Sequence, residues 1–247
     1  MRKLALAVAM LVVTGTSALA DGSIKDAPVV VAPTWEGAYV GLQIGGLWAD
    51  WNSSNAISDP GIGPFTDPGF PLGGFDGSGV TGGMHFGFNH QMGSFVGGFE
   101  VDLNFTNADD TRNFLAVGVP PGLPLTIKQS IDSYGTVRAR AGYARDRVLV
   151  YATGGVAWAA VESSLTSPGQ FAGPFATGDR HMLTGWTAGA GVSYMISPQW
   201  LLGLEYKHID LGDKAYTYTF PFAGGTPVTT HIDLVMDEVT LRLSRKF

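Results

Sequence analysis

Alternation of apolar and polar residues is clearest in the segment Phe95–Thr106, FVGGFEVDLNFT. Its odd-numbered positions are apolar or glycine, whereas its even-numbered positions from Gly98 on include Glu100, Asp102 and Asn104. Because successive side chains of a β-strand point to opposite faces, the pattern predicts a strand with one apolar face and one polar, acidic face. A soluble sandwich strand would alternate in the same way, so the interpretation depends on the other segments.

Seven further segments alternate similarly, which raises the number of predicted strands to eight. Together they predict an all-β fold, an eight-stranded antiparallel up-and-down transmembrane β-barrel. The predicted strands cover 35–48, 80–90, 95–106, 131–143, 148–161, 184–195, 200–211 and a C-terminal segment that ends at 247.

The connections between these strands alternate in length along the chain. Tight turns are predicted at 91–94, 144–147 and 197–199. Long loops are predicted at 49–79, at 107–129, after 161 up to about 183, and after 211. Long extracellular loops at one end and short periplasmic turns at the other are typical of outer-membrane barrels.

The alternation also assigns a face to the side chains of the two middle segments. In 131–143, strict alternation places Ile131 and Val137 on the outward face and Tyr134 on the inward face. Both faces of 148–161 are fairly apolar, and there Val156 and Trp158 are assigned outward.

The aromatic residues of the outward faces gather at two heights. Such girdles bracket the apolar band of proteins that contact lipid. Those at the periplasmic strand ends are Phe88, Phe95, Tyr143, Tyr194, Trp200 and Phe247, and those near the outer ends are Trp48, Phe105, Trp158 and Trp186.

A lipocalin-like barrel or a β-sandwich is the alternative, but a soluble barrel would place its apolar residues inside. Here the charged residues share the face opposite the aromatics, which favours the membrane barrel.

The first twenty residues are predicted to be a cleaved secretory signal. Arg2 and Lys3 precede a short apolar run, and Ala18-Leu19-Ala20 forms an A-x-A cleavage site. The run is too short to span a bilayer as a helix. The sequence therefore predicts a signal peptide over 1–20, a periplasmic N-terminal extension over 21–34 and a barrel over 35–247.

Net charge and amino-acid composition further restrict the class of protein. The leader holds two of the 15 basic residues and none of the 21 acidic ones, so the mature chain has a formal charge of −8, which argues against nucleic acid as a partner. The chain has no cysteine, so no disulfide framework can hold it. The 35 glycines and the low share of charged residues, 15%, suit an all-β membrane chain.

Four motifs resemble the outer-membrane immunogenic-protein family, small OmpA-like eight-stranded barrels of Gram-negative alphaproteobacteria. They are WEGAYVGLQIGG at 35–46, YGTVRARAGYA at 134–144, LEYKHIDLG at 204–212 and the terminal Phe247. The resemblance implies a surface protein of the outer membrane, tied to envelope integrity and host contact and without enzymatic activity. It also implies that Phe247 carries the signal for barrel insertion by the assembly machinery. The usual ending is aromatic–basic–Phe, whereas this chain ends Arg245-Lys246-Phe247.

Charged residues assigned to the inward face lie at similar depth. Since buried charges are stable only when they are paired, we expect Glu100 and Asp102 to meet Arg138 and Arg140, and Glu205 to meet Arg242. The full set is Glu100, Asp102, Arg138, Arg140, Glu205, Lys207 and Arg242. The preferred interpretation is a structural ion-pair plug, and the alternative is a gate whose ion pairs exchange partners.

Catalytic and metal chemistry find little support in the sequence. His181 and His231 lie in or near outer loops, each two residues from an aspartate, Asp179 and Asp233, but a nucleophile–base pair needs a proximity that sequence cannot supply. His85 is expected to hydrogen-bond in the lumen, because no pair of histidines has metal-site spacing. No cofactor is predicted.

Aromatic residues also recur in the last outer loop, at Tyr216, Tyr218, Phe220 and Phe222. They would either extend a strand above the membrane as an adhesive rim or, in the preferred interpretation, anchor in lipopolysaccharide or pack on the hairpin. The sequence thus predicts an outer-membrane surface protein whose expected partners are lipid, lipopolysaccharide, the assembly machinery and a surface or host ligand at the outer loops. A narrow porin is the alternative function, and a barrel enzyme is a more remote one.

Overall fold

The computed structural model describes residues 34–56, 75–116, 123–168, 175–219 and 227–247. The chain separates into Met1–Ala32 and Pro33–Phe247, and every described residue belongs to the second unit. The predicted signal peptide and nearly all of the predicted N-terminal extension therefore lie outside the described residues. Within those ranges, no helix is long and apolar enough to cross a membrane.

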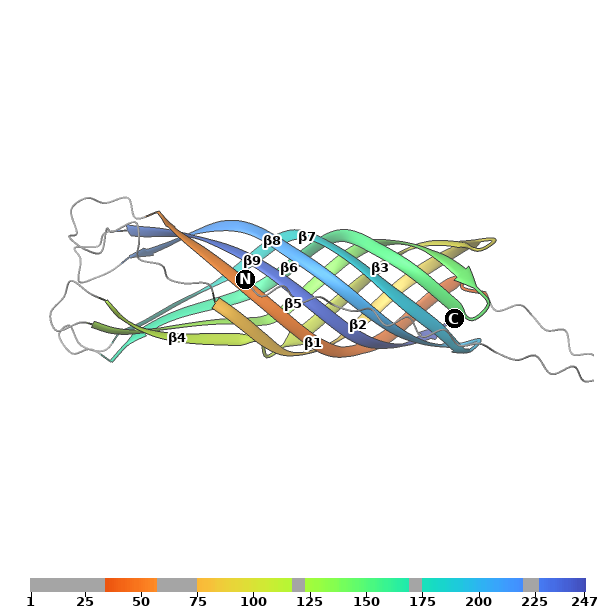
Figure 1. Ribbon diagram of the computed structural model, residues 1–247, viewed down its shortest axis with the longest axis horizontal. Helices are drawn as coiled ribbons and strands as arrows, with labels where there is room; N and C mark the ends of the chain where they lie inside the picture. Colours follow the sequence, from red (N-terminus) through yellow and green to blue (C-terminus); the bar gives the residue numbers. More distant parts are fainter. Residues whose placement is uncertain (1–33, 57–74, 117–122, 169–174, 220–226) are drawn as a thin grey trace, which may run out of the picture. The chain divides into compact units, whose positions relative to one another are not determined.

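Antiparallel strands account for almost all of the described chain (Figure 1). Their bounds are β1 Gly37–Ala56, β2 Phe75–Met92, β3 Phe95–Thr106, β4 Asp109–Ala116, β5 Leu123–Arg145, β6 Val148–Ser167, β7 Phe175–Ser197, β8 Trp200–Thr219 and β9 Pro227–Lys246.

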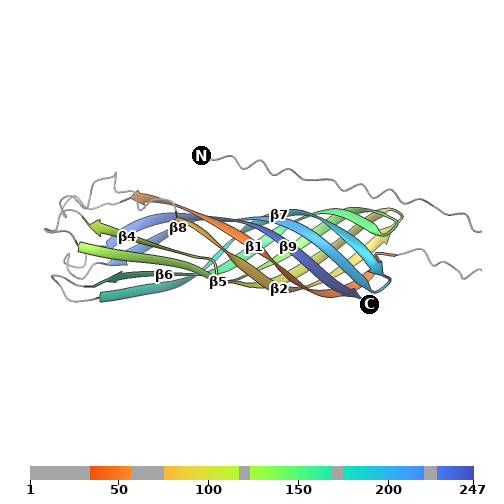
Figure 2. The same ribbon diagram turned by 60° about the horizontal axis from the view of Figure 1, so that its bottom comes forward.

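The sheet closes on itself. Except for β3 and β4, each strand pairs with the next along the chain, and β1 pairs with β2 on one side and with β9 on the other. β3 and β4 occupy one position in the wall, because both pair with β5 and only Asn107 and Ala108 separate them. The nine labelled strands therefore form a closed eight-stranded antiparallel barrel, as predicted, and two views show the strands inclined around it (Figures 1 and 2).

The strands extend further toward the long-loop end than predicted. The predicted loop at 49–79 is wrong in extent, since β1 continues to Ala56 and β2 begins at Phe75. The predicted loop at 107–129 contains β4 and the beginning of β5, which pair as a hairpin. Alternation is lost there because a strand beyond the lipid band can meet water on its outer face, whereas its backbone pairing continues.

The predicted outward direction of Ile131 is also wrong. The β5–β6 register shifts between Ile131 and Ser133, so Asp132 is an extra residue in β5. A bulge of this kind reverses the faces on one side of it. Ile131 consequently points into the barrel with 1% of its surface exposed, while Val137 keeps its outward direction.

Both termini of the barrel unit are fixed at the short-turn end. The Trp35 backbone amide donates to Gln91 Oε1 at 2.6 Å, and the Gln91 backbone amide donates to Glu36 Oε2 at 2.5 Å. Hydrogen bonds from the Gln91 backbone amide and the His90 ring stabilise the charged Glu36 carboxylate, so they lower the pKa of this carboxyl. At the other terminus, the Phe247 amide donates to the Ala38 carbonyl at 2.9 Å.

Inward-facing glycines make room for large side chains of neighbouring strands. A Cβ at Gly87 would lie 2.4 Å from Tyr39 Cζ and 2.8 Å from the Phe99 carbonyl oxygen. A Cβ at Gly191 would lie 2.5 Å from Tyr151 Cζ. Glycine is therefore required where a tyrosine ring lies flat against the barrel wall.

We expect Gly87→Ala to destabilise the barrel by about 1–3 kcal/mol, because neither the Tyr39 ring nor the Phe99 backbone can move away without strain. Gly97→Ala is the matched control, since a Cβ there meets nothing within 4 Å. Urea unfolding of the refolded protein checks both variants. Equal unfolding midpoints for the two alanine variants would contradict this account.

Candidate functional site: the charged lumen

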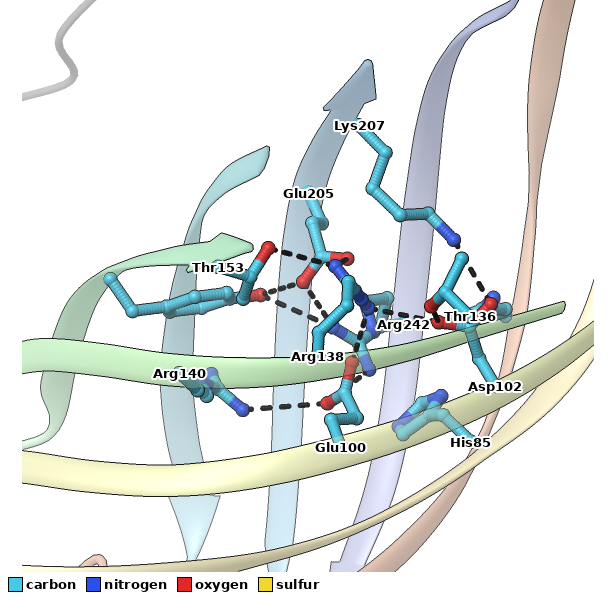
Figure 3. Close-up of polar contacts among 12 residues, drawn as sticks. His85, Glu100, Asp102, Thr136, Arg138, Arg140, Thr153, Glu205, Lys207 and Arg242 are labelled. Atoms are coloured by element: carbon cyan, nitrogen blue, oxygen red, sulfur yellow. Dashed lines mark hydrogen bonds and ion pairs between the residues drawn. The ribbon is translucent and has the colours of Figure 1, made fainter. Parts of the chain in front are cut away.

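The middle of the lumen holds eight buried charged side chains among the described residues, and Figure 3 labels all of them except Glu238. They come from four strands, because the alternation of each strand directs its charged positions inward. They are Glu100 and Asp102 of β3, Arg138 and Arg140 of β5, Glu205 and Lys207 of β8, and Glu238 and Arg242 of β9. The seven residues singled out from the sequence are thus brought together, and Glu238 joins them.

Arg138 is the centre of this cluster (Figure 3). Its Nη2 lies 2.5 Å from Glu100 Oε1 and 3.0 Å from Asp102 Oδ2, both on the neighbouring strand β3. Its Nη1 lies 2.7 Å from Glu205 Oε1 on β8, which is not a neighbour of β5. The guanidinium therefore connects opposite parts of the barrel wall across the lumen.

Two further arginines complete the pairing of the glutamates. Arg242 Nη2 lies 2.6 Å from Glu100 Oε2, and Arg242 Nη1 also pairs with Glu205. Arg140 Nη1 lies 3.6 Å from Glu100 Oε2, and its guanidinium lies 3.5 Å above the Tyr151 ring. Both glutamates thus contact more than one guanidinium, which offsets their loss of hydration.

Lys207 is shared between two carboxylates at the outer side of the cluster. Its Nζ lies 3.3 Å from Asp102 Oδ1 and 2.9 Å from Glu238 Oε2. Glu238 is not among the charged residues predicted from the sequence, although its position two residues before Thr240 and four before Arg242 places it on the same inward face. With Glu238, four acidic side chains balance four basic ones.

Neutral side chains supply further hydrogen bonds to three of the four carboxylates. The Tyr39 hydroxyl donates to Glu100 at 2.7 Å, the Tyr151 hydroxyl to Glu205 at 2.8 Å, and the Thr136 hydroxyl to Asp102 at 2.5 Å. Each of these donors is buried, so the charges meet an organised polar environment in place of bulk water.

Apolar side chains fill the lumen on both sides of the charged cluster. Toward the short turns, a buried layer comprises Trp35, Val96, Ala144, Leu149, Tyr151, Met195 and Leu201. Toward the long loops, a larger layer of fourteen buried residues includes Leu47, Trp51, Ile131, Leu183 and Met236. The polar lumen predicted from the sequence is therefore polar at mid-height and apolar above and below it.

The predicted girdle residues lie on the outer surface of the barrel. Nine of the ten are exposed large side chains, among them Phe95 with 65% of its surface exposed and Phe247 with 72%. Trp158 is only half-exposed, because its ring covers Gly135 of β5. The Phe95 and Tyr143 rings meet edge to face at 5.6 Å. An apolar outer face between two aromatic girdles is suited to contact with lipid.

The residues considered for catalysis are not assembled into a described site. His181 lies on β7, and the side chains of Asp179 and His231 fall outside the described set. His85 Nε2 lies 2.7 Å from Ser244 Oγ, but this pair is buried inside the lumen. His208 Nδ1 lies 2.9 Å from Asp237 Oδ1 on the outward face of β8 and β9, a contact that the sequence analysis missed. No three described His, Asp or Glu side chains are grouped so as to hold a metal ion.

A closed barrel with an apolar, aromatic-bracketed outer face and a cluster of charges buried in its lumen defines a transmembrane β-barrel. The comparisons with known proteins place it in the outer membrane. The chain matches the model of the outer membrane protein beta-barrel domain over residues 5–247. It belongs to this outer-membrane β-barrel family.

Three relatives of the chain come from the alphaproteobacteria Brucella and Rhizobium. The chain is 31% identical over 211 residues to the 31 kDa outer-membrane immunogenic protein of Brucella melitensis, covering 81% of this chain and 83% of that protein. It is 27% identical over 242 residues to the 25 kDa outer-membrane immunogenic protein of Brucella abortus, covering 94% and 93%. The 22 kDa outer membrane protein of Rhizobium leguminosarum is 27% identical over 192 residues, covering 78% and 72%.

Solved structures share the fold at low sequence identity. OprG of Pseudomonas aeruginosa aligns with a TM-score of 0.51 at 14% identity, covering 86% of this chain and 96% of that one. The outer membrane protease OmpT of Escherichia coli gives the same TM-score at 10% identity, covering 85% and 97%. At these identities the likeness concerns the barrel fold alone.

Replacing Arg138 with alanine is expected to lower the free energy of unfolding by about 3–5 kcal/mol, because Glu100, Asp102 and Glu205 each lose a buried partner. Lys128→Ala is the control. Lys128 pairs with Asp109 at 3.3 Å on an exposed surface, where such a pair contributes about 0–1 kcal/mol. Urea unfolding in lipid or detergent measures both, and an Arg138→Ala midpoint equal to wild type would refute the stabilising role.

Proposed function

We propose that this protein is a structural and surface-interactive component of the outer membrane, with a closed lumen and no enzymatic activity. The observation that carries the proposal is the ion-pair network that crosses the lumen through Arg138, between Glu100 on β3 and Glu205 on β8. In an eight-stranded barrel, side chains of this size fill the interior. Buried apolar layers on both sides of the network support the same conclusion.

A closed lumen leaves the two rims and the outer surface as the parts that meet other molecules. Strands that continue beyond the outer aromatic girdle, such as β1 to Ala56 and β8 to Thr219, carry the long loops away from the membrane. The Brucella relatives are named immunogenic proteins, which supports a role for these loops in surface or host contact. Tyr216 and Tyr218 lie on β8, whereas Phe220 and Phe222 lie outside the described residues.

We expect the refolded residues 21–247 to be electrically silent in a planar bilayer, or to show only rare, small openings. The reason is that an ion would have to displace buried ion pairs and cross two apolar layers without its hydration shell. A steady open level that changes when Arg138 or Arg140 is replaced would contradict the closed lumen and identify a narrow porin.

The narrow porin remains the second candidate because of Lys207. This side chain contacts both Asp102 and Glu238, so a small movement of its ammonium group would favour one carboxylate over the other. Partner exchange of this kind would open a path at one side of the cluster. Single-channel conductance distinguishes the two functions, since only the porin gives a stable open level.

The surface role is tested separately. Replacing Tyr216, Tyr218, Phe220 and Phe222 with serine is expected to reduce association of cells with host or neighbouring-cell surfaces, because aromatic side chains dominate contact energies at such interfaces. Envelope resistance to detergent, measured in the same strain, is expected to stay at the wild-type level. Unchanged association in a correctly folded variant would argue that these aromatics anchor in lipopolysaccharide.

A further inference from the structure

Three arginines at the short-turn rim are exposed and make no ion pair in the part of the chain that the structure describes. Arg145 ends β5, Arg147 lies in the turn to β6, and Arg245 lies near the end of β9. Each is a permanently charged guanidinium with free donors directed toward the surroundings of the barrel. The rim they occupy is the periplasmic end of the barrel.

Basic side chains at the long-loop end of the barrel differ from these arginines, because they form ion pairs. Arg112 Nε lies 3.2 Å from Asp110 Oδ2, Lys128 Nζ lies 3.3 Å from Asp109 Oδ2, and Arg180 Nη2 lies 3.6 Å from Asp132 Oδ2. These are the basic side chains described at the long-loop end, and each has a carboxylate partner. Among the side chains that the structure describes, the arginines without an ion pair therefore lie at the periplasmic rim.

Arg245 faces lipid within the aromatic girdle itself. It pairs across the backbone with Trp200 on one side and Val40 on the other, and all three side chains are exposed on the outward face. Its guanidinium carbon lies 5.6 Å from the Phe247 ring centroid. An arginine thus occupies a position of the girdle where its stem lies against apolar surface and its charged end lies at the height of the headgroups.

Arg145 has a similar position on the other side of the barrel. It follows Tyr143 by two residues on the same outward face, just beyond the Tyr143–Phe95 aromatic pair. Arg147 adds a third charge in the adjoining turn. Because β5 and β9 are separated by three strands, the charges are distributed around the rim and are not gathered in one pocket.

We propose that this arginine rim binds the headgroup phosphates of anionic phospholipids in the periplasmic leaflet. A guanidinium donates two parallel hydrogen bonds to a phosphate, and the adjoining Trp200, Phe247 and Tyr143 rings contact the glycerol and upper acyl region. A lipid with net negative charge is preferred over a zwitterionic one, because none of the three arginines forms an ion pair with a described carboxylate, although Asp146 stands between Arg145 and Arg147 in the turn. The long-loop end, rich in aspartate, does not attract such lipids.

The test uses refolded residues 21–247 in phosphatidylcholine bilayers that contain a spin-labelled lipid, either phosphatidylglycerol or phosphatidylcholine. The motionally restricted fraction of each label gives its relative association with the protein. We expect phosphatidylglycerol to be favoured about fivefold, the attraction of roughly one basic residue for an anionic lipid surface. The preference should fall as salt is added.

The triple variant Arg145→Gln, Arg147→Gln, Arg245→Gln should lose this preference and associate equally with both lipids. The matched control Arg112→Gln, Lys128→Gln removes two basic side chains from the long-loop end and should retain it. Conversion of the three rim arginines to lysine should retain most of it. Equal association of the two labels with wild type, or an undiminished preference in the triple variant, would overturn the proposal.

A folding defect in the triple variant does not prevent the test. The single variants Arg245→Gln and Arg145→Gln change exposed side chains that make no ion pair, so both should fold, as shown by heat-modifiable migration in gels. Each should lower the phosphatidylglycerol preference in part. Wild-type preference in both single variants would equally refute the role of the rim.

Discussion

Removal of charged groups from water is the constraint on which the rest of this structure depends. A carboxylate or guanidinium in the lumen is destabilising by several kcal/mol unless partners replace its hydration. Arg138 meets that requirement for three carboxylates at once, and Lys207 meets it for Asp102 and Glu238. Since two of these pairs, Arg138 with Glu205 and Lys207 with Asp102, join strands that are not neighbours, the wall must close at one register for the charges to be satisfied together.

The same requirement accounts for features outside the cluster. Tyr39 and Tyr151 donate to Glu100 and Glu205 only because glycines on neighbouring strands leave space for their rings. The apolar layers on either side keep water from competing for the ion pairs, which strengthens each pair. The polar contacts of the lumen, the glycines beside the tyrosine rings and the strand register therefore all follow from the need to pair the buried charges.

Most of the fold was predicted from the alternation of apolar and polar residues. The alternation arises because each strand of the closed sheet has one face toward lipid and one toward the filled lumen, and the two faces differ chemically. That is why the eight-stranded barrel and the inward direction of Arg138, Glu205 and Arg242 could be inferred from sequence. The bulge at Asp132 could not, because a local register shift leaves no mark in composition, and it reversed the expected direction of Ile131. The cross-lumen pair of Arg138 with Glu205 was equally beyond sequence, since it depends on side-chain reach between strands that are not neighbours.

The seam between β1 and β9 has a consequence for biogenesis. It joins Tyr39 to Lys246, residues from opposite ends of the barrel sequence, and the Phe247 amide adds a hydrogen bond to Ala38. Contacts of such long sequence separation are entropically late to form. The last strand must therefore be synthesised and exported before the barrel can close, and until then the edges of β1 and β9 that form the seam stay unpaired.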